Sequence, residues 1–290
     1  MVQQTQRDPQ EAYPGKDLGA RGFVATVQIL SNYYEGLQID PDWYTGQSPY
    51  GSTVAPSMTL TAVDGGFPGA GFKNNFGTLW IRQEWDSFKP IIPGEDYKAT
   101  SKVVDVYQHR NRTVVNQQVT LLTLDGETMA QGHHHQSFLL DQSSGKVQLR
   151  DPKAKEGARR FAIRDGETLE SSGHVITLEM CGSFFHGNAN YHTNKEAARE
   201  LGFEEVVVGG RMTLSYLGDL MDKRFGKGWY ESGRLDIKFT NIVWPGDRVI
   251  AKGVVTDSVS ENGGTRAKVA IWMEKEDGAV VIVGTASALQ

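Results

Sequence analysis

The sequence has little of several features that mark specialised classes of protein. It contains 290 residues and a single cysteine, Cys181, so an intrachain disulfide cannot form. No apolar run approaches the roughly 20 residues that a membrane-spanning helix needs. The first ten residues are polar and lack the apolar core of a secretory signal. Together these absences predict a cytoplasmic protein with no membrane partner.

Charge of one sign is not concentrated anywhere in the chain. The 30 Lys and Arg residues are outnumbered by 35 Asp and Glu residues, and the net charge is -5. A protein without a basic stripe is a poor match for the phosphate backbone of a nucleic acid. Hydrophobic residues make up 39% of the chain, which is enough for a sizeable core. We therefore expect a globular protein that does not bind nucleic acid.

What the sequence does contain is a repeat of itself at the scale of a domain. Four pairs of matching positions are separated by 151 to 154 residues: Gly36 with Gly187, Met58 with Met212, Gly94 with Gly246, and Gly132 with Gly284. Such a repeat predicts two similar units in one chain. We place the first unit at residues 1–140 and the second at residues 174–290. The polar stretch between them, residues 141–173, is expected to be a linker.

Hydrophobic periodicity predicts the same order of elements in both halves, one main helix followed by several strands. In the first half we expect a helix at 54–63 and strands at 79–86, 96–108, 112–124 and 129–140. In the second half we expect helices at 195–201 and 211–225 and strands at 234–239, 248–257, 265–275 and 279–288. A helix wrapped by a curved antiparallel sheet is the hotdog fold, so the prediction is an α+β double hotdog. The two sheets are expected to pair edge to edge, which hides edge strands.

Three stretches of the second half match one enzyme family. Residues 187–198, GNANYHTNKEAA, are similar to the motif Gly-Asp-x-Asn-Pro-x-His-x-x-x-Glu-x-Ala. Residues 208–212 are similar to the segment that opens the family's central helix, and residues 243–247 to its Pro-Gly-Asp turn. The chain thus resembles the MaoC-like (type 2, R-specific) enoyl-CoA hydratase and dehydratase family. Its first half resembles the degenerate hotdog of fused members.

This resemblance implies a reaction and a set of expected partners. The reaction is reversible water addition between 2-enoyl and 3-hydroxyacyl thioesters of CoA or a carrier protein. Neither a metal nor a redox cofactor is expected, and the chain is expected to form a homodimer. Two alternatives remain open: another acyl-thioester reaction, such as hydrolysis, isomerisation or decarboxylation, or a non-catalytic acyl-binding or partner subunit.

The resemblance also assigns roles to residues. His192 matches the motif's histidine and is expected to act as general acid and base. Gly210 opens the central helix, and its N–H is expected to polarise the thioester carbonyl and stabilise the enolate. Asn190 is expected to shape the active-site loop. The further substrate-binding candidates are Ser183, His186, Gly187, Tyr34 and Arg211, the last of which is suited to a CoA phosphate or a substrate carboxylate.

The sequence departs from the family at the acidic partner of the histidine. The family's aspartate lies five residues before the histidine, whereas Asn188 lies four before His192 and the five-residue spacing falls on Gly187. Asparagine can hold a water but cannot accept its proton. Asn188 is therefore expected to orient water or the 3-hydroxyl group. Three routes stay open for the proton: His192 alone, with help from His186, or with help from Glu35 of the first half.

Two further features have simple interpretations. His133 and His135 would share one face of a strand, but no acidic or cysteine partner sits at metal-ligand spacing. We expect the triplet His133-His134-His135 to have a structural or pocket-lining role. Cys181 is expected to be a small buried hydrophobe on one strand with Ser183.

Overall fold

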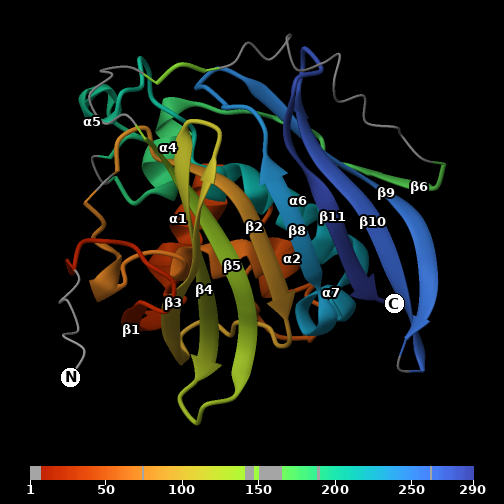
Figure 1. The fold of residues 1–290 in the computed structure, drawn as a ribbon. Helices are drawn as coiled ribbons and strands as arrows, with labels where there is room; N and C mark the ends of the chain where they lie inside the picture. The colour runs from red at the N-terminus through yellow and green to blue at the C-terminus, as the bar shows by residue number, and fades with distance from the viewer. Residues whose placement is uncertain (1–7, 74, 141–146, 150–164, 188–189, 262) are drawn as a thin grey trace.

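A computed structural model describes residues 8–73, 75–140, 147–149, 165–187, 190–261 and 263–290. The strands of this part form one 11-stranded antiparallel sheet, in the order β1-β3-β4-β5-β2-β8-β11-β10-β9-β6, with β7 also pairing with β9. Figure 1 shows this sheet curving around helices gathered on one of its faces. The architecture confirms the predicted double hotdog.

The strands alternate buried and exposed residues because one face of the sheet packs on the helices. In the first half they are β1 (Asp17–Val24), β2 (Leu79–Ser87), β3 (Asp96–His109), β4 (Arg112–Thr123) and β5 (Thr128–Leu139). In the second half they are β6 (Glu167–Glu170), β7 (His174–Val175), β8 (Arg234–Phe239), β9 (Arg248–Glu261), β10 (Gly264–Lys275) and β11 (Val280–Leu289). The main strands predicted from periodicity therefore form close to their expected bounds.

The two half-sheets join edge to edge through β2 and β8, as predicted. Trp85 pairs with Leu235 and Arg82 with Lys238 across this seam. The Arg82 guanidinium donates to both carboxylate oxygens of Asp236, at 2.9 and 2.7 Å. A bidentate pair of this kind fixes orientation as well as adding energy. The seam makes one continuous sheet from two repeats, and both central helices lie against it.

The helices are α1 (Val27–Leu37), α2 (Asp42–Thr45), η1 (Ser57–Val63) and η2 (Pro68–Ala70) in the first half, and α4 (Leu178–Phe184), α5 (Lys195–Glu200), α6 (Gly210–Phe225) and α7 (Lys227–Ser232) in the second. The helix predicted at 54–63 forms over Ser57–Val63, as the 3₁₀ helix η1. The hydroxyls of Thr59 and Thr61 donate to carbonyls three residues earlier, which favours the tighter turn.

The repeat that relates Gly36 to Gly187 matches the end of α1 with the end of α4, and these two helices pack against each other. A Cβ atom on Gly36 of α1 would lie 2.6 Å from Cβ of Phe184 in α4, so only glycine allows this approach. Thr177 caps α4 by accepting a hydrogen bond from the Met180 N–H at 3.1 Å. The expectation that Cys181 and Ser183 share a strand is therefore wrong, because both lie on α4. Cys181 itself is buried, as expected.

Part of the stretch predicted as a linker belongs to the sheet instead. β6, within residues 141–173, pairs with β9, and Glu167 of β6 accepts two hydrogen bonds from Arg224 of α6. The polar composition of this edge strand conceals it, since three of its four residues face solvent. In the described residues, no helix is both long enough and apolar enough to cross a membrane.

Candidate active site

A cleft of about 1690 Å³ opens where the two halves meet, beside the junction of β2 and β8. From the second half, the loop before α5, the start of α6 and the end of β8 contribute His192, Gly210, Arg211 and Phe239. From the first half, the opposing lining includes Arg21, Asp64, Trp80 and His134. This volume is large enough to hold a large organic ligand. Neither half could form this cleft alone.

His192 is held in one tautomer and between aromatic rings. Its Nδ1 lies 2.7 Å from the Val207 carbonyl oxygen, and because a carbonyl only accepts, Nδ1 must donate. The proton acceptor left on the ring is Nε2. Phe185 stacks on the imidazole at a centroid distance of 4.6 Å, and Tyr191 lies at 3.8 Å on a tilted plane. Burial lowers the pKa of His192 to about 4, helped by the Arg211 charge and opposed by the Val207 hydrogen bond. The ring is therefore neutral at pH 7.

The loop that presents His192 is held by hydrogen bonds of Asn190. The Asn190 side-chain oxygen accepts a hydrogen bond from the His192 backbone N–H at 2.8 Å. The backbone N–H of Asn190 donates to the Thr193 hydroxyl at 3.0 Å. Asn194 then caps α5 by accepting from the Ala197 N–H at 2.9 Å. Short-range polar contacts thus define the backbone on both sides of the imidazole.

Two glycines pack the start of α6 against its neighbours, and one of them, Gly210, lines the cleft. A Cβ atom on Gly209 would lie 2.2 Å from Cζ of Phe185, and one on Gly210 would lie 2.8 Å from a ring carbon of Trp80. Both glycines are therefore required for packing as well as for access. Gly210 is the first residue of the 16-residue α6. The Met212 and Thr213 N–H groups donate to the Gly209 carbonyl at 3.0 and 3.3 Å, which leaves the N–H groups of Gly210 and Arg211 without a partner inside the helix. This places the positive end of a helix dipole at the cleft wall.

A cluster of charged residues from three more elements shares the cleft. Asp64, at the end of η1, is only 6% exposed, and its Oδ2 lies 3.4 Å from Nδ1 of His134. Burial raises the Asp64 pKa, while His134, Arg211 and Arg21 act to lower it. Asp64 is the one carboxylate among the described residues that line the cleft.

Several predicted residues lie away from the cleft. His186 is exposed, and its ring contacts the Asn32 side chain of α1. Glu35 is also exposed and accepts from the Ser31 hydroxyl at 2.9 Å, so neither of these two candidate proton carriers lines the cleft. Tyr34 stacks on Tyr44 at 5.8 Å within the aromatic core.

The remaining predicted residues divide into three cases. Ser183 contributes its backbone carbonyl to the turn after α4, accepting from the His186 N–H, and is absent from the lining. Gly187 is exposed with φ of 67°, a left-handed conformation that glycine adopts without strain. Asn188 lies outside the described residues, so its role stays a prediction.

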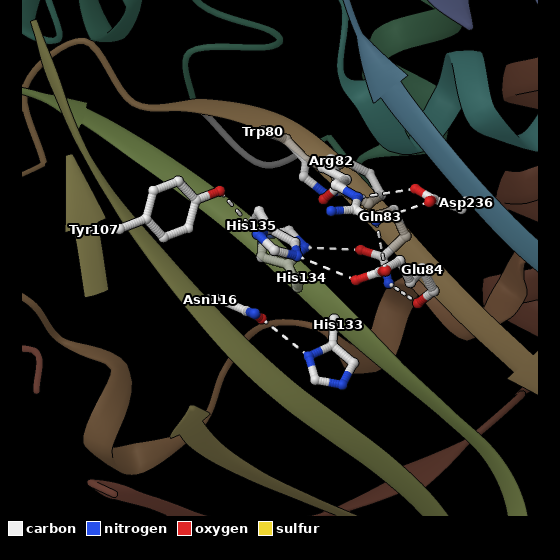
Figure 2. Close-up of polar contacts among 10 residues, drawn as sticks. All are labelled: Trp80, Arg82, Gln83, Glu84, Tyr107, Asn116, His133, His134, His135 and Asp236. Atoms are coloured by element: carbon white, nitrogen blue, oxygen red, sulfur yellow. Dashed lines mark hydrogen bonds and ion pairs between the residues drawn. The ribbon is translucent and has the colours of Figure 1, made fainter. Parts of the chain in front are cut away.

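The histidine triplet on β5 divides between the two faces of the sheet (Figure 2). His133 contacts Asn116 at 3.1 Å, and His135 contacts Tyr107 and Glu84, each at 3.2 Å. His134 faces the other way and contacts the Trp80 ring in the cleft, with the ring centroids 4.9 Å apart and the planes tilted by 33°. Within the described ranges, no three His, Cys, Asp or Glu side chains are placed to hold a metal ion.

The sequence analysis missed Arg21, Asp64 and Trp80. Asp64 stands in Asp-Gly-Gly, a pattern that is typical of the end of a helix. Arg21 lies on β1 and Trp80 on β2. No local pattern reveals that these positions meet, since the sheet pairing that joins them spans the chain.

Comparison with known proteins finds one family model and several solved structures that are similar to the chain. Residues 184–276 match the sequence model of the MaoC like domain. No curated protein matches the chain. Three solved structures share its fold at low identity. One from Chloroflexus aurantiacus, assigned as a MaoC domain dehydratase, has a TM-score of 0.72 and 14% identity and covers 99% of each chain.

The other two structures share the fold under different descriptions. A conserved hypothetical protein of Mycobacterium tuberculosis described as a double hotdog has a TM-score of 0.64 and 12% identity, with 98% of each chain covered. A protein of Lactobacillus plantarum assigned as an oleoyl thioesterase has a TM-score of 0.55 and 13% identity, with 94% of this chain and 95% of that chain covered. At these identities the likeness concerns the fold alone.

Proposed function

We propose that the protein adds water reversibly and R-specifically to 2-enoyl thioesters, because residues 184–276 match the model of the MaoC like domain. The acyl group is linked to CoA or a carrier protein, and the product is the 3-hydroxyacyl thioester. One observation supports this reaction above others. His192 lines a cleft with its Nδ1 fixed on a carbonyl, and Gly210 at the start of α6 lines the same cleft.

The proposed reaction takes one proton from water and returns it to the substrate. His192 Nε2 takes a proton from water as the water oxygen bonds to C3 of the enoyl group. The C2–C3 π electrons shift toward the thioester carbonyl, and the enolate oxygen that forms is stabilised by N–H groups at the start of α6. The imidazolium then returns the proton to C2. Water is thereby added across the double bond, and His192 ends neutral as it began.

A single imidazole is sufficient for this proton balance, because the proton removed from water is the one that C2 requires. Asn188, in its predicted role, orients the water rather than deprotonating it. The low pKa of His192 keeps Nε2 unprotonated and available at neutral pH. It also makes the imidazolium a strong acid, which favours rapid return of the proton to C2.

The test is hydration of crotonyl-CoA by the purified full chain, with chiral analysis of the 3-hydroxybutyryl product. We expect the R product, and we expect His192→Ala to lower kcat/KM by about 100-fold or more. The His186→Ala variant, altered at an exposed ring outside the cleft, should retain activity. Loss of activity in His186→Ala with retention in His192→Ala would contradict the assignment of the proton carrier.

A second readout separates the proposal from its rivals. Release of free CoA thiol is measured in the same reactions, because one structure of this fold is assigned as a thioesterase. Thiol release without a hydrated product would replace hydration by hydrolysis. Binding of acyl-CoA with neither product would replace both by acyl binding without catalysis.

A further inference from the structure

Three side chains in the cleft have buried polar atoms without hydrogen-bond partners. They are Nε of Arg21, Nε of Arg211 and both carboxylate oxygens of Asp64, of which Oδ2 has only the ion-pair contact with His134 Nδ1 at 3.4 Å. Asp64 is more than nine-tenths buried. Burying a polar group without a partner costs free energy, so such atoms are rare in folded proteins unless a ligand or water satisfies them. Their concentration on the lining of one cleft points to a polar ligand.

The charges of these residues do not cancel. Arg21 and Arg211 are both permanently protonated, and Asp64 supplies at most one negative charge. Among the described residues, no carboxylate approaches either guanidinium within ion-pair distance. The Arg21 guanidinium donates instead to the carbonyls of Gly22 and Ala62. At least one positive charge is thus left uncompensated in a partly buried site, and an anionic ligand would balance it.

We propose that Arg21, Asp64 and Arg211 form an anion site that binds a carboxylate at the far end of the substrate's acyl chain. This inference rests on the proposed function, since it assumes an acyl thioester in the cleft. The substrate class is then the thioester of a short unsaturated dicarboxylic acid rather than of a plain fatty acid. The two guanidiniums donate to the carboxylate, and Asp64 holds them in place by its charge.

The position of the site relative to His192 suits a short chain. The Phe185 ring stacks on His192 at 4.6 Å, and its centroid lies 6.0 Å from Cζ of Arg211. One aromatic ring therefore contacts both the proton carrier and the anion site. Arg211 also directly follows Gly210, whose N–H is proposed to bind the thioester oxygen.

A CoA phosphate is the other anion that could occupy an arginine site. The cleft offers exposed cations for that purpose, including Arg110 and Lys238. CoA phosphates are strongly hydrated and are suited to such solvent-exposed partners, whereas Asp64 and the Nε atoms of both arginines are buried. The arrangement favours the acyl carboxylate at the buried site, and the experiment separates the two anions.

The experiment compares ligands that cannot be hydrated, so that it does not depend on catalysis. Succinyl-CoA and butyryl-CoA have the same chain length and differ in a terminal carboxylate or methyl group. By calorimetry on the full chain, we expect succinyl-CoA to bind about 10- to 100-fold more tightly, the range for charge-assisted hydrogen bonds. Arg211→Gln and Arg21→Gln should each remove most of that difference. Lys238→Gln, the matched control, should change both affinities by the same factor.

Pantetheine thioesters, which lack the nucleotide phosphates of CoA, identify the bound anion. We expect succinyl-pantetheine to keep its advantage over butyryl-pantetheine. The inference is overturned if succinyl-CoA and butyryl-CoA bind equally. It is also overturned if the arginine variants weaken both CoA esters alike and neither pantetheine ester, because the site would then bind a CoA phosphate. Melting temperatures of the variants confirm that each is folded.

Hydration assays then distinguish failure of the anion-site inference from failure of the proposed function. The matched substrates are crotonyl-CoA and the CoA monothioester of fumarate, which carry a methyl and a carboxylate at C3. Preferred binding of succinyl-CoA without hydration of either substrate supports the anion site and contradicts the hydratase. Hydration of both substrates at equal kcat/KM supports the hydratase and contradicts the anion site.

Discussion

Titration of His192 provides a direct test of the site. Burial in the cleft wall is the main cause that lowers its pKa, and the Arg211 charge adds to it. The Val207 carbonyl, which accepts from Nδ1, opposes both. The resulting pKa of about 4 lies about 2.5 units below that of a free histidine, which means that protonating the ring in the folded protein costs about 3.4 kcal/mol more.

The assay is proton NMR of the imidazole C–H resonances between pH 3.5 and pH 8, with His192→Gln to assign the signal. At pH 5.5 we expect about 3% of His192 to be protonated, against about 90% for a histidine with a normal pKa. The same protein unfolded in urea gives the reference value. A midpoint near 6.5 in the folded protein would refute the buried, singly protonated ring described above.

The same shift has consequences for catalysis and for stability. The kcat/KM for crotonyl-CoA should stay level from pH 8 down to about pH 5 and fall only near pH 4. Between the folded pKa of about 4 and the unfolded value of 6.5, the unfolded state binds more protons, so the free energy of unfolding rises with pH across that window. His192→Gln should remove this contribution to the slope.

Three further predictions concern packing and buried charge. Burial of Asp222, the main cause, raises its pKa to about 7, so its contribution to stability is lost as the pH rises from about 4 through 7. The difference in free energy of unfolding between Asp222→Asn and wild type, measured by urea titration, should therefore move by about 2.5 kcal/mol in favour of the variant from pH 5 to pH 8. Parallel pH profiles of the two proteins would contradict the raised pKa. Gly36→Ala should destabilise the protein by about 1–3 kcal/mol, because the added methyl would meet Phe184 of α4 at 2.6 Å. Gly182→Ala, on α4 with no atom within 4 Å of the added Cβ, is its control and should be neutral or stabilising by up to about 1 kcal/mol in the same denaturation assay. Gly210→Ala places a methyl 2.8 Å from a tryptophan ring of β2, so we expect a lower melting temperature together with a reduced kcat for crotonyl-CoA. Unchanged values of both would contradict this prediction and show that the tryptophan ring moves aside.

The elements that the sequence predicted well are those with long, regular patterns. The strands β2, β3, β4, β5 and β8 alternate over most of their length, and α6 has apolar residues around most of its circumference. The structure differs from the predicted elements where local chemistry competes with the pattern. η1 contains two threonines that bond to the preceding turn, and β6 is a short polar edge strand.

The candidate site divides in the same way. A contiguous motif was enough to single out His192, Asn190 and Gly210, because the loop around His192 is held by contacts between residues two to four positions apart. The exclusion of His186 and Glu35 from the cleft required the structure. Both are polar residues at repeat-related positions, and sequence alone does not give the direction of a side chain at a helix end.

Sequence by itself determined that this is a duplicated hotdog with its motif histidine in the second half, because repeat spacing and hydrophobic period are local properties of the chain. Tertiary structure alone decided what faces that histidine. Arg21, Asp64 and Arg211 are separated by up to 190 positions, and they share a cleft only because β2 pairs with β8 and closes two half-sheets into one. The uncompensated positive charge in the cleft arises from that pairing, because it depends on all three residues lying together and they come from three separate segments.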